Sequence, residues 1–250
     1  MAKQVINILE LRKTKIELSN NIEMLKEQNL ALDRFASIAA HDIKSPLNSI
    51  VSLVEIFRAN CFDQLDEEGK ELMEHAQDSV YKLISLINSI LKFAKSGEKI
   101  TEDKEEIAVE ELSKEINQIL NADKKSKIRF DSELLSIRIH KTVIIQILIN
   151  LIGNAIKYND KEQIEIELKI VAKSKFYHFY VIDNGPGIPE RIQEKIFEPF
   201  ETGNKKDRNG EMGNGIGLAT VKRLVQNSKG KIDVKSSEGN GSTFHFTIKR

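Results

Sequence analysis

The stretch HDIKSPL, residues 41–47, decides the fold of the first third of the chain, because it sets a histidine and a proline inside one long helical pattern. Residues 2–60 contain one proline and no glycine, and their apolar residues recur at alternating spacings of three and four. This heptad spacing predicts a coiled-coil helix. Its a and d positions are Ile8, Leu11, Lys15, Leu18, Ile22, Leu25, Asn29, Leu32, Ala36, Ala39 and Ile43.

The two polar members of this seam, Lys15 and Asn29, both fall at position a. A polar residue at a fixes register and favours two parallel strands, so the seam predicts a parallel homodimer. The alternative is a helix that packs within its own chain. We favour the dimer because a seam of this length needs a partner helix.

The same register places His41 at position f, the outermost point of the coil. An outward imidazole is not a core histidine, so His41 is either an ordinary surface residue or a reacting group. Pro46 follows five residues later, removes a backbone donor and bends the helix. A proline has little structural use there unless a bend is wanted.

A second amphipathic run, residues 71–95, follows the break FDQLDEEGK at residues 62–70 and predicts a helical hairpin. Two such hairpins, one from each chain, would form a four-helix bundle with His41 on its outer face. The polar, charged segment that follows, residues 97–106, is typical of a linker. A second domain therefore begins at residue 107.

This second domain mixes helical and alternating patterns and predicts an α/β sandwich. The predicted helices cover residues 109–120, 141–158 and 214–228, and the predicted strands cover residues 127–130, 163–171, 176–182, 231–236 and 242–249.

Polar residues interrupt the predicted helix at residues 141–158. Asn150 and Asn154 are four apart and share a helix face, and Lys157 adds a cation one turn further on. Amide oxygens suit Mg²⁺, and an ammonium suits phosphate. Taken alone, the pattern also fits a polar helix edge.

Two glycine-containing stretches supply the remaining candidate site. DNGPGIP, residues 183–189, puts Asp183 at a strand end, where it can accept a hydrogen bond from an exocyclic amine. GNGIGL, residues 213–218, leads into a helix whose N-terminus can hold phosphate. Either stretch alone fits a simple turn, and the glycine spacing differs from P-loop and Rossmann loops.

The amino-acid composition limits the partners and the cellular compartment that we expect for the protein. Lys and Arg total 38, Asp and Glu total 38, and no basic stripe suggests nucleic acid. The lone Cys61 fits a reducing compartment, and no run of about 18 apolar residues suggests a membrane segment. We expect a cytoplasmic protein.

In this order, the boxes resemble the histidine protein kinases of two-component signalling, in which a dimerisation and phosphotransfer hairpin precedes a GHKL (Bergerat-type) ATP-binding domain. The resemblance covers about residues 30–250. It is carried by HDIKSPL (41–47), NLIGNAIKY (150–158), DNGPGIP (183–189), IFEPF (196–200), GNGIGL (213–218) and GNGSTFHF (239–246).

The resemblance implies a role for each matching residue. His41 would attack the γ-phosphate of ATP, with Asp42 as general base or orienting group. Asn150 and Asn154 would hold Mg²⁺, and Lys157 the phosphates. The other nucleotide contacts would be Tyr158, Asp183 with Thr243 at the adenine, and Gly185, Gly187, Ile188, Phe197, Phe200, Gly213, Gly215, Gly217 and Leu218.

The resemblance also implies a mobile lid at residues 201–212, in which Lys205, Lys206 and Arg208 can meet phosphate. Ser45 departs from the family, whose phosphatase members carry Thr or Asn there, so phosphatase activity stays open.

The implied partner is the receiver domain of a response regulator, chosen through Ser49, Val51, Ser52 and Glu55. Residues 1–30 would form a signalling coiled coil and residues 31–96 the hairpin. An upstream sensor domain or protein would supply the signal. The rival readings are a GHKL ATPase clamp and an inactive dimeric scaffold.

Overall fold

The computed structural model describes residues 2–97, 103–120, 126–208 and 210–250. Within the first helix, the side chains of residues 2–10, 22, 25, 26, 29 and 30 lie outside this description. The chain divides into two compact units, Met1–Glu98 and Lys99–Arg250.

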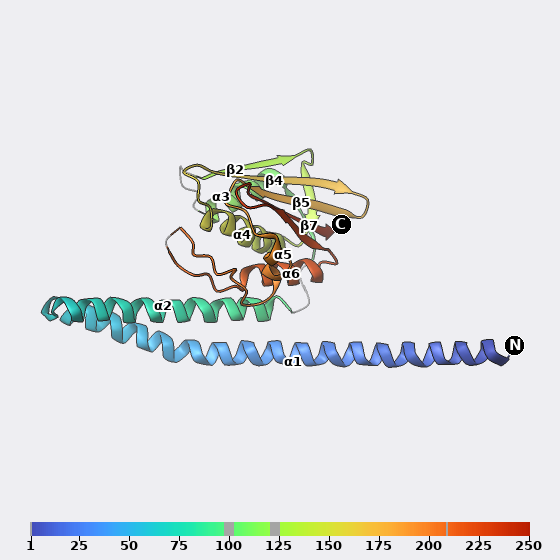
Figure 1. Cartoon of the computed structure of the whole chain (residues 1–250), viewed down its shortest axis with the longest axis horizontal. Helices are drawn as coiled ribbons and strands as arrows, with labels where there is room; N and C mark the ends of the chain where they lie inside the picture. Colours follow the sequence, from blue (N-terminus) through green and yellow to red (C-terminus); the bar gives the residue numbers. More distant parts are fainter. Residues whose placement is uncertain (1, 98–102, 121–125, 209) are drawn as a thin grey trace. The chain divides into compact units, whose positions relative to one another are not determined.

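The first unit is a helical hairpin (Figure 1). Helix α1 spans Ala2–Cys61 and continues through Pro46, and α2 spans Glu67–Lys95. A short 3₁₀ turn, η1 (Phe62–Gln64), joins them. The Asp66 carboxylate caps α2 by accepting the Gly69 N–H at 2.8 Å. Both helices predicted from the apolar spacing are confirmed.

The hairpin has a thin core and a large open apolar surface. Ala40 and Leu47 of α1 pack against Ile87 of α2, and Val80, Ile84, Ile90 and Leu91 line this contact. Other apolar side chains of α1 stay exposed in the single chain; they include Leu11, Leu18, Leu32, Phe35, Ile43, Leu53 and Phe57. Of the predicted seam, Ile8, Ile22, Leu25 and Asn29 lie outside the described side chains.

The second unit is a five-stranded sheet covered on one face by helices (Figure 1). The strand order is β2-β4-β5-β7-β6, with β2 parallel to β4 and the other neighbours antiparallel. The strands are β2 (Ser126–Ser132), β4 (Ile164–Lys173), β5 (Phe176–Asp183), β6 (Ile232–Ser236) and β7 (Ser242–Lys249). This is the α/β sandwich that the sequence predicts.

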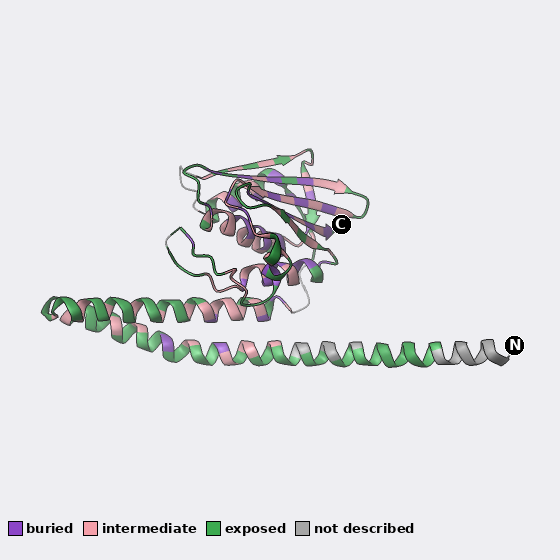
Figure 2. Cartoon of the chain, viewed as in Figure 1, coloured by how far each residue is buried: buried purple, intermediate pink, exposed green. Residues whose placement is uncertain are grey.

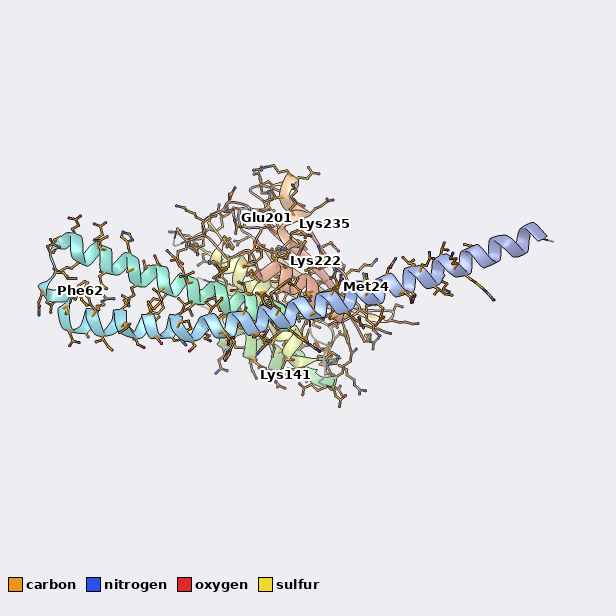
Figure 3. All side chains as sticks on the ribbon, turned by 90° about the horizontal axis from the view of Figure 1, so that it is seen from below. Met24, Phe62, Lys141, Glu201, Lys222 and Lys235 are labelled. Atoms are coloured by element: carbon orange, nitrogen blue, oxygen red, sulfur yellow. The ribbon has the colours of Figure 1, made fainter. Side chains whose placement is uncertain are left out.

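Helices α3 (Val109–Ile119), α4 (Lys141–Lys157) and α6 (Gly217–Asn227) supply the covering layer. Buried and less buried residues alternate along the strands, as Figure 2 shows. At the start of α4, Lys141, labelled in Figure 3, pairs with Glu111 at 3.0 Å and Glu115 at 3.1 Å of α3.

Four short elements of the second unit were not predicted from the sequence. Strands β1 (Glu105–Ala108) and β3 (Ser136–Ile139) pair antiparallel in a separate two-stranded sheet. The other two are α5 (Glu190–Gln193) and η2 (Lys195–Phe197). Segments of three or four residues are too short to show a period, so only the tertiary structure identifies them.

Candidate functional site

His41 lies on the exposed surface of α1, as its heptad position predicts. Its side chain is 81% exposed, and its Nδ1 lies 3.3 Å from Oδ1 of Asp42. A carboxylate that accepts from Nδ1–H leaves Nε2 as the ring nitrogen with a free lone pair. In that tautomer, the exposed ring offers Nε2 as a nucleophile.

Two apolar residues of α1 near this histidine are buried. Ala40 and Leu47, on either side of the HDIKSP segment, are buried against α2. Pro46 has no N–H, so the carbonyl of Asp42 receives no helical hydrogen bond from it. The exposed Ser45 accepts, through its backbone carbonyl, a bond from the Ser49 hydroxyl at 3.4 Å. Core packing therefore fixes the helix while His41 stays accessible.

In the second unit, α4 directs the amide of Asn150 toward GNGIGL (residues 213–218), the second of the two glycine boxes; the first is DNGPGIP (residues 183–189). Nδ2 of Asn150 donates to the Gln146 carbonyl at 2.8 Å, which turns Oδ1 away from its own helix. A Cβ at Gly217 would lie 3.1 Å from that oxygen. Asn154, half-buried, lies one turn further along α4. An oxygen held in this way fits Mg²⁺, a hard cation that prefers oxygen ligands.

Lys157 and Tyr158 close the carboxyl end of α4. The Lys157 ammonium lies 5.7 Å from the centre of the Tyr158 ring and 3.2 Å from Oδ2 of Asp207. The Tyr158 hydroxyl comes so close to Gly213 that a Cβ there would lie 2.1 Å from it. A side chain at residue 213 would therefore displace the Tyr158 hydroxyl.

Asp183 ends β5 with its carboxylate turned toward the helical layer. Oδ1 accepts the Gly185 N–H at 2.8 Å. Burial raises the pKa of Asp183, while the backbone N–H groups of Gly185 and Ser242 and the charge of Lys205 oppose that rise. A partly desolvated acceptor of this kind suits a neutral donor such as an exocyclic amine.

The predicted partnership of Thr243 with Asp183 is wrong. The β5–β7 register sets Ser242 opposite Asp183, and Thr243 opposite Ile182. Side chains alternate between the faces of a sheet, so Thr243 points to the other face. Ser242 is the buried residue on the Asp183 side. The prediction was off by one residue in the closing strand, and adjacent residues of a strand face opposite sides of the sheet.

Two glycines, one in each glycine-containing stretch, allow backbone segments to touch, and a third lies against a side chain. At Gly187, with φ of +73°, a Cβ would lie 2.0 Å from the Ser237 carbonyl oxygen. At Gly215, with φ of +65°, a Cβ would lie 2.5 Å from the Phe200 carbonyl carbon. At Gly185 a Cβ would come 2.9 Å from Oδ1 of Asp183. A side chain at Gly187 or Gly215 would collide with the backbone, whereas one at Gly185 would press on the Asp183 carboxylate.

The glycine boxes also fix their neighbours. The Ile188 N–H donates to the Ser236 hydroxyl at 2.8 Å. Helix α6 begins at Gly217. Its N-cap residue, Ile216, has no side-chain oxygen that could accept from the first N–H groups of the helix. Half-buried Leu218 packs against the core. The second glycine-containing stretch thus leads into a helix that packs on the core.

The two phenylalanines of IFEPF, Phe197 and Phe200, lie in different surroundings. Phe197 is buried and meets Phe244 edge to face, with ring centres 6.3 Å apart, so it is a core residue. Phe200 is 63% exposed and has φ of +67°, a strained conformation for a bulky residue. Its N–H donates to the Gly215 carbonyl at 2.9 Å. Phe200 therefore ties the start of the lid to the second glycine box.

An ion pair joins the segment before the lid to α6. Lys222 of α6 binds Oε1 of Glu198 at 2.8 Å. Lys222 and, at the start of the lid, Glu201 are labelled in Figure 3. The Glu201 carboxylate accepts the Gly203 N–H at 2.9 Å. The lid thus begins in an ordered turn.

Sequence reasoning missed a pair of amides near Asp183, of which Asn159 is buried and Asn184 is half-buried. Nδ2 of Asn159 donates to Oδ1 of Asn184 at 3.0 Å, and Oδ1 of Asn159 accepts the Lys161 N–H at 2.9 Å. Asn184 also accepts the Glu165 N–H. The pair joins the end of α4 to the end of β5. The signal was available, since one Asn follows NLIGNAIKY directly and the other lies within DNGPGIP.

The cationic side chains of the lid and one of its carboxylates differ in their exposure to solvent. Lys205, Lys206 and Arg208 are exposed, whereas the Asp207 side chain is 2% exposed. No role for Asp207 was predicted. Among the described residues, no group of three or more His, Cys, Asp or Glu side chains is arranged to hold a metal ion. In the same part of the chain, no helix is long and apolar enough to cross a membrane.

Two family models match the chain. Residues 31–99 match the His Kinase A (phospho-acceptor) domain, and residues 139–250 match the histidine kinase-, DNA gyrase B- and HSP90-like ATPase. The first match contains His41, and the second contains every box of the nucleotide site. Each unit thus contains most of one family match.

Similar proteins agree with these matches. Cyanobacterial phytochrome A of Nostoc sp. is 31% identical over 99% of this chain and 32% of its own length. Adaptive-response sensory kinase SasA of Crocosphaera subtropica is 33% identical over 92% of this chain and 63% of its own length. The chain spans about a third of the length of its phytochrome relatives.

Solved structures share the fold. Full-length ShkA in complex with AMPPNP matches with a TM-score of 0.68 and 26% identity, over 86% of this chain and 45% of that chain. The catalytic domain of histidine kinase ThkA matches with a TM-score of 0.50 and 28% identity, over 59% of this chain and 96% of that chain. With a phospho-acceptor hairpin followed by a GHKL ATP-binding domain, this chain belongs to the histidine protein kinases.

Proposed function

We propose that the chain uses ATP and Mg²⁺ to phosphorylate His41, and then passes the phosphoryl group to an aspartate of a response-regulator receiver domain. The observation that carries the proposal is the exposed His41, paired with Asp42 at 3.3 Å, in a chain that also holds a GHKL site. An ATPase clamp would have no use for this hairpin.

The reaction follows from the tautomer that Asp42 favours. Nε2 of His41 attacks the γ-phosphorus, the new P–N bond forms, and the bond to the bridging oxygen of ADP breaks. The Asp42 carboxylate accepts the hydrogen bond from Nδ1–H and stabilises the positive charge that develops on the ring. Phosphoryl transfer needs little more from the protein than alignment and charge neutralisation.

The second unit supplies the nucleotide contacts. Asp183 would accept from the adenine amine, Lys157 would face the phosphates, and Asn150 and Asn154 would offer amide oxygens to Mg²⁺. Bound Mg²⁺ would neutralise phosphate charge. The role of Asp183 is supported by its raised pKa, and that of Asn150 by the orientation that Gln146 imposes.

The partners are proposed on the same basis. The open apolar stripe of α1, with Leu32, Ile43 and Leu53 exposed, would pair with a second copy of the hairpin. A structure of the histidine kinase ThkA holds the response regulator protein TrrA. Its likeness to this chain, at 23% identity, shows the fold alone. Exposed Ser49, Ser52 and Glu55 offer the surface for such a regulator.

Incubation with γ-labelled ATP and Mg²⁺ tests the proposal. The native chain should acquire an acid-labile, alkali-stable label, and His41→Gln should acquire none. His75→Gln is the matched control, since His75 is also exposed on the hairpin, and it should label normally. Labelling of His41→Gln at the native level would overturn the assignment.

A phosphatase activity toward the phosphorylated regulator is a second proposal. It rests on the exposed Ser45, four residues after His41, whose hydroxyl can orient a water molecule. Adding the kinase with ADP to a phosphorylated receiver domain should accelerate loss of its label, and Ser45→Ala should remove the acceleration. Equal rates for the two chains would refute a role for Ser45.

A further inference from the structure

The described lid residues 206–208 and 210–212 form a folded turn. Lys206 and Met212 form an antiparallel bridge. Within it, the Asp207 N–H donates to the Glu211 carbonyl at 2.8 Å, and the Gly210 N–H donates to the Asp207 carbonyl at 3.0 Å. This part of the lid therefore has a definite structure around Asp207.

Asp207 is buried in the middle of this turn. Its Oδ1 accepts the Glu211 N–H at 2.8 Å, and its Oδ2 lies 3.2 Å from the Lys157 ammonium. A buried carboxylate is costly unless hydrogen bonds and an opposite charge compensate it. Lys157, whose side chain is 41% exposed, supplies that charge.

A second contact fastens the same two segments. The Arg208 N–H donates to the Lys157 carbonyl at 3.1 Å. The lid turn is thus joined to the end of α4 through both the backbone and the side chain of Lys157. We call the Lys157–Asp207 ion pair the lid latch.

We propose that Asp207 competes with the phosphates of the nucleotide for the Lys157 ammonium, and so sets the affinity of the site according to phosphate charge. The proposal rests on the proposed function, in which Lys157 faces the phosphates. A nucleotide phosphate that reaches this ammonium must displace Asp207 or share the ammonium with it. Adenosine carries no phosphate and meets no such competition.

The direction of the effect follows from charge. While the latch is closed, the Asp207 carboxylate offsets most of the charge of Lys157 and repels an incoming phosphate. Removing the carboxylate charge should strengthen phosphate binding and leave adenosine binding unchanged. Asp207 is thus a specificity-determining residue that touches none of the reacting atoms.

Asp207→Asn is the sharpest variant, since the amide oxygen can still accept the Glu211 N–H and keep the turn folded. Calorimetry on the full chain should show Mg-ATP and Mg-ADP bound about three- to ten-fold more tightly, with adenosine unchanged. Glu211→Gln removes one negative charge from the same turn at an exposed position, and it should change neither affinity by more than about two-fold.

A double-mutant cycle isolates the latch. In a Lys157→Gln chain there is no ammonium to compete for, so adding Asp207→Asn should bring a much smaller gain in ATP affinity, limited to the lost repulsion between the carboxylate and the phosphates. A gain of the same size in both backgrounds would overturn the proposal, as would a gain that adenosine shares.

A measurement on the unaltered chain covers the case in which Asp207→Asn disturbs folding. In protein with carboxyl-labelled aspartate, the Asp207 resonance should shift when ATP is added and stay in place when adenosine is added. Shifts of equal size with both ligands would refute the latch. If the native chain binds neither ATP nor adenosine, the proposed function itself fails, whereas ATP binding that Asp207→Asn leaves unchanged overturns the latch alone.

Discussion

The two units of this chain bury their apolar residues to very different extents. Among the described residues of the hairpin, the core consists of Ala40, Leu47 and Ile87. In the second unit, one continuous core joins the helices α3, α4 and α6 to the inner face of the sheet. Hydrophobic burial is the main favourable term in folding. The ATP-binding unit can therefore stabilise itself, whereas the hairpin leaves an apolar stripe for a partner.

The largest effect is expected in the core of the second unit. Phe179 and Phe246 are fully buried and stack with ring centres 4.7 Å apart. Phe246→Ala should lower the free energy of unfolding of this unit by about 3–5 kcal/mol. Thermal unfolding followed by near-ultraviolet circular dichroism measures it. Thr247→Ala, on the other face of β7, should cost far less, and equal losses would contradict the proposed difference in burial.

The next effect concerns the open stripe of the hairpin. Leu53 is exposed in the single chain, and Leu53→Lys should weaken dimerisation by about 2 kcal/mol or more, because each dimer loses two buried leucines. Sedimentation over a range of concentrations gives the dissociation constant. Ser52→Lys is the control at a neighbouring exposed position. If both variants dimerise like the native chain, this stripe does not form the interface.

A smaller effect separates stability from binding at Asp183. The pKa of this carboxyl is raised by burial. Its contribution to stability is complete below the ordinary Asp pKa and is lost as the pH rises through the raised value. Asp183→Asn should therefore bind ATP at least tenfold more weakly, about 1.4 kcal/mol, without becoming less stable at neutral pH.

Urea unfolding of the nucleotide-free chain and calorimetric titration with ATP measure the two quantities separately. Asp160→Asn, an exposed acid beyond the end of α4, serves as the control and should alter neither. A destabilised Asp183→Asn chain would show that the carboxylate is structural.

The smallest effect lies on the face of the sheet away from the helices. His178 Nδ1 lies 3.0 Å from His245 Nε2, and His245 Nδ1 lies 2.9 Å from the Asp233 carboxylate. Burial lowers the pKa of His178, and the charges of His245 and Lys173 lower it further. Stability should be complete above the ordinary histidine pKa and fall as the pH drops through the lowered value.

Urea unfolding at a series of pH values measures this dependence, which should amount to less than about 1 kcal/mol. His178→Gln should flatten the curve between pH 7 and pH 5 (about the range in which histidine titrates). An unchanged slope in that variant would assign the dependence to another group.

The long regular elements could be predicted because their apolar spacing repeats many times. The bounds of α2, α4 and β5 fall within about four residues of the predicted ones. The short pair β1 and β3 could not be predicted, since four residues show no period. The predicted contact of Thr243 with Asp183 was wrong for a related reason, because an error of one residue in a strand exchanges the two faces of the sheet.

The sequence by itself determined the order of the boxes, the outward position of His41 and the residue types that suit phosphate and adenine. These are local properties, fixed by spacing along a helix or by the chemistry of one side chain. The tertiary structure alone decided which residues meet across the chain: Ser242 opposite Asp183, Phe197 in the core, and Asp207 on Lys157. Such contacts join residues about 40 to 60 positions apart, and they depend on register and packing that no local pattern encodes.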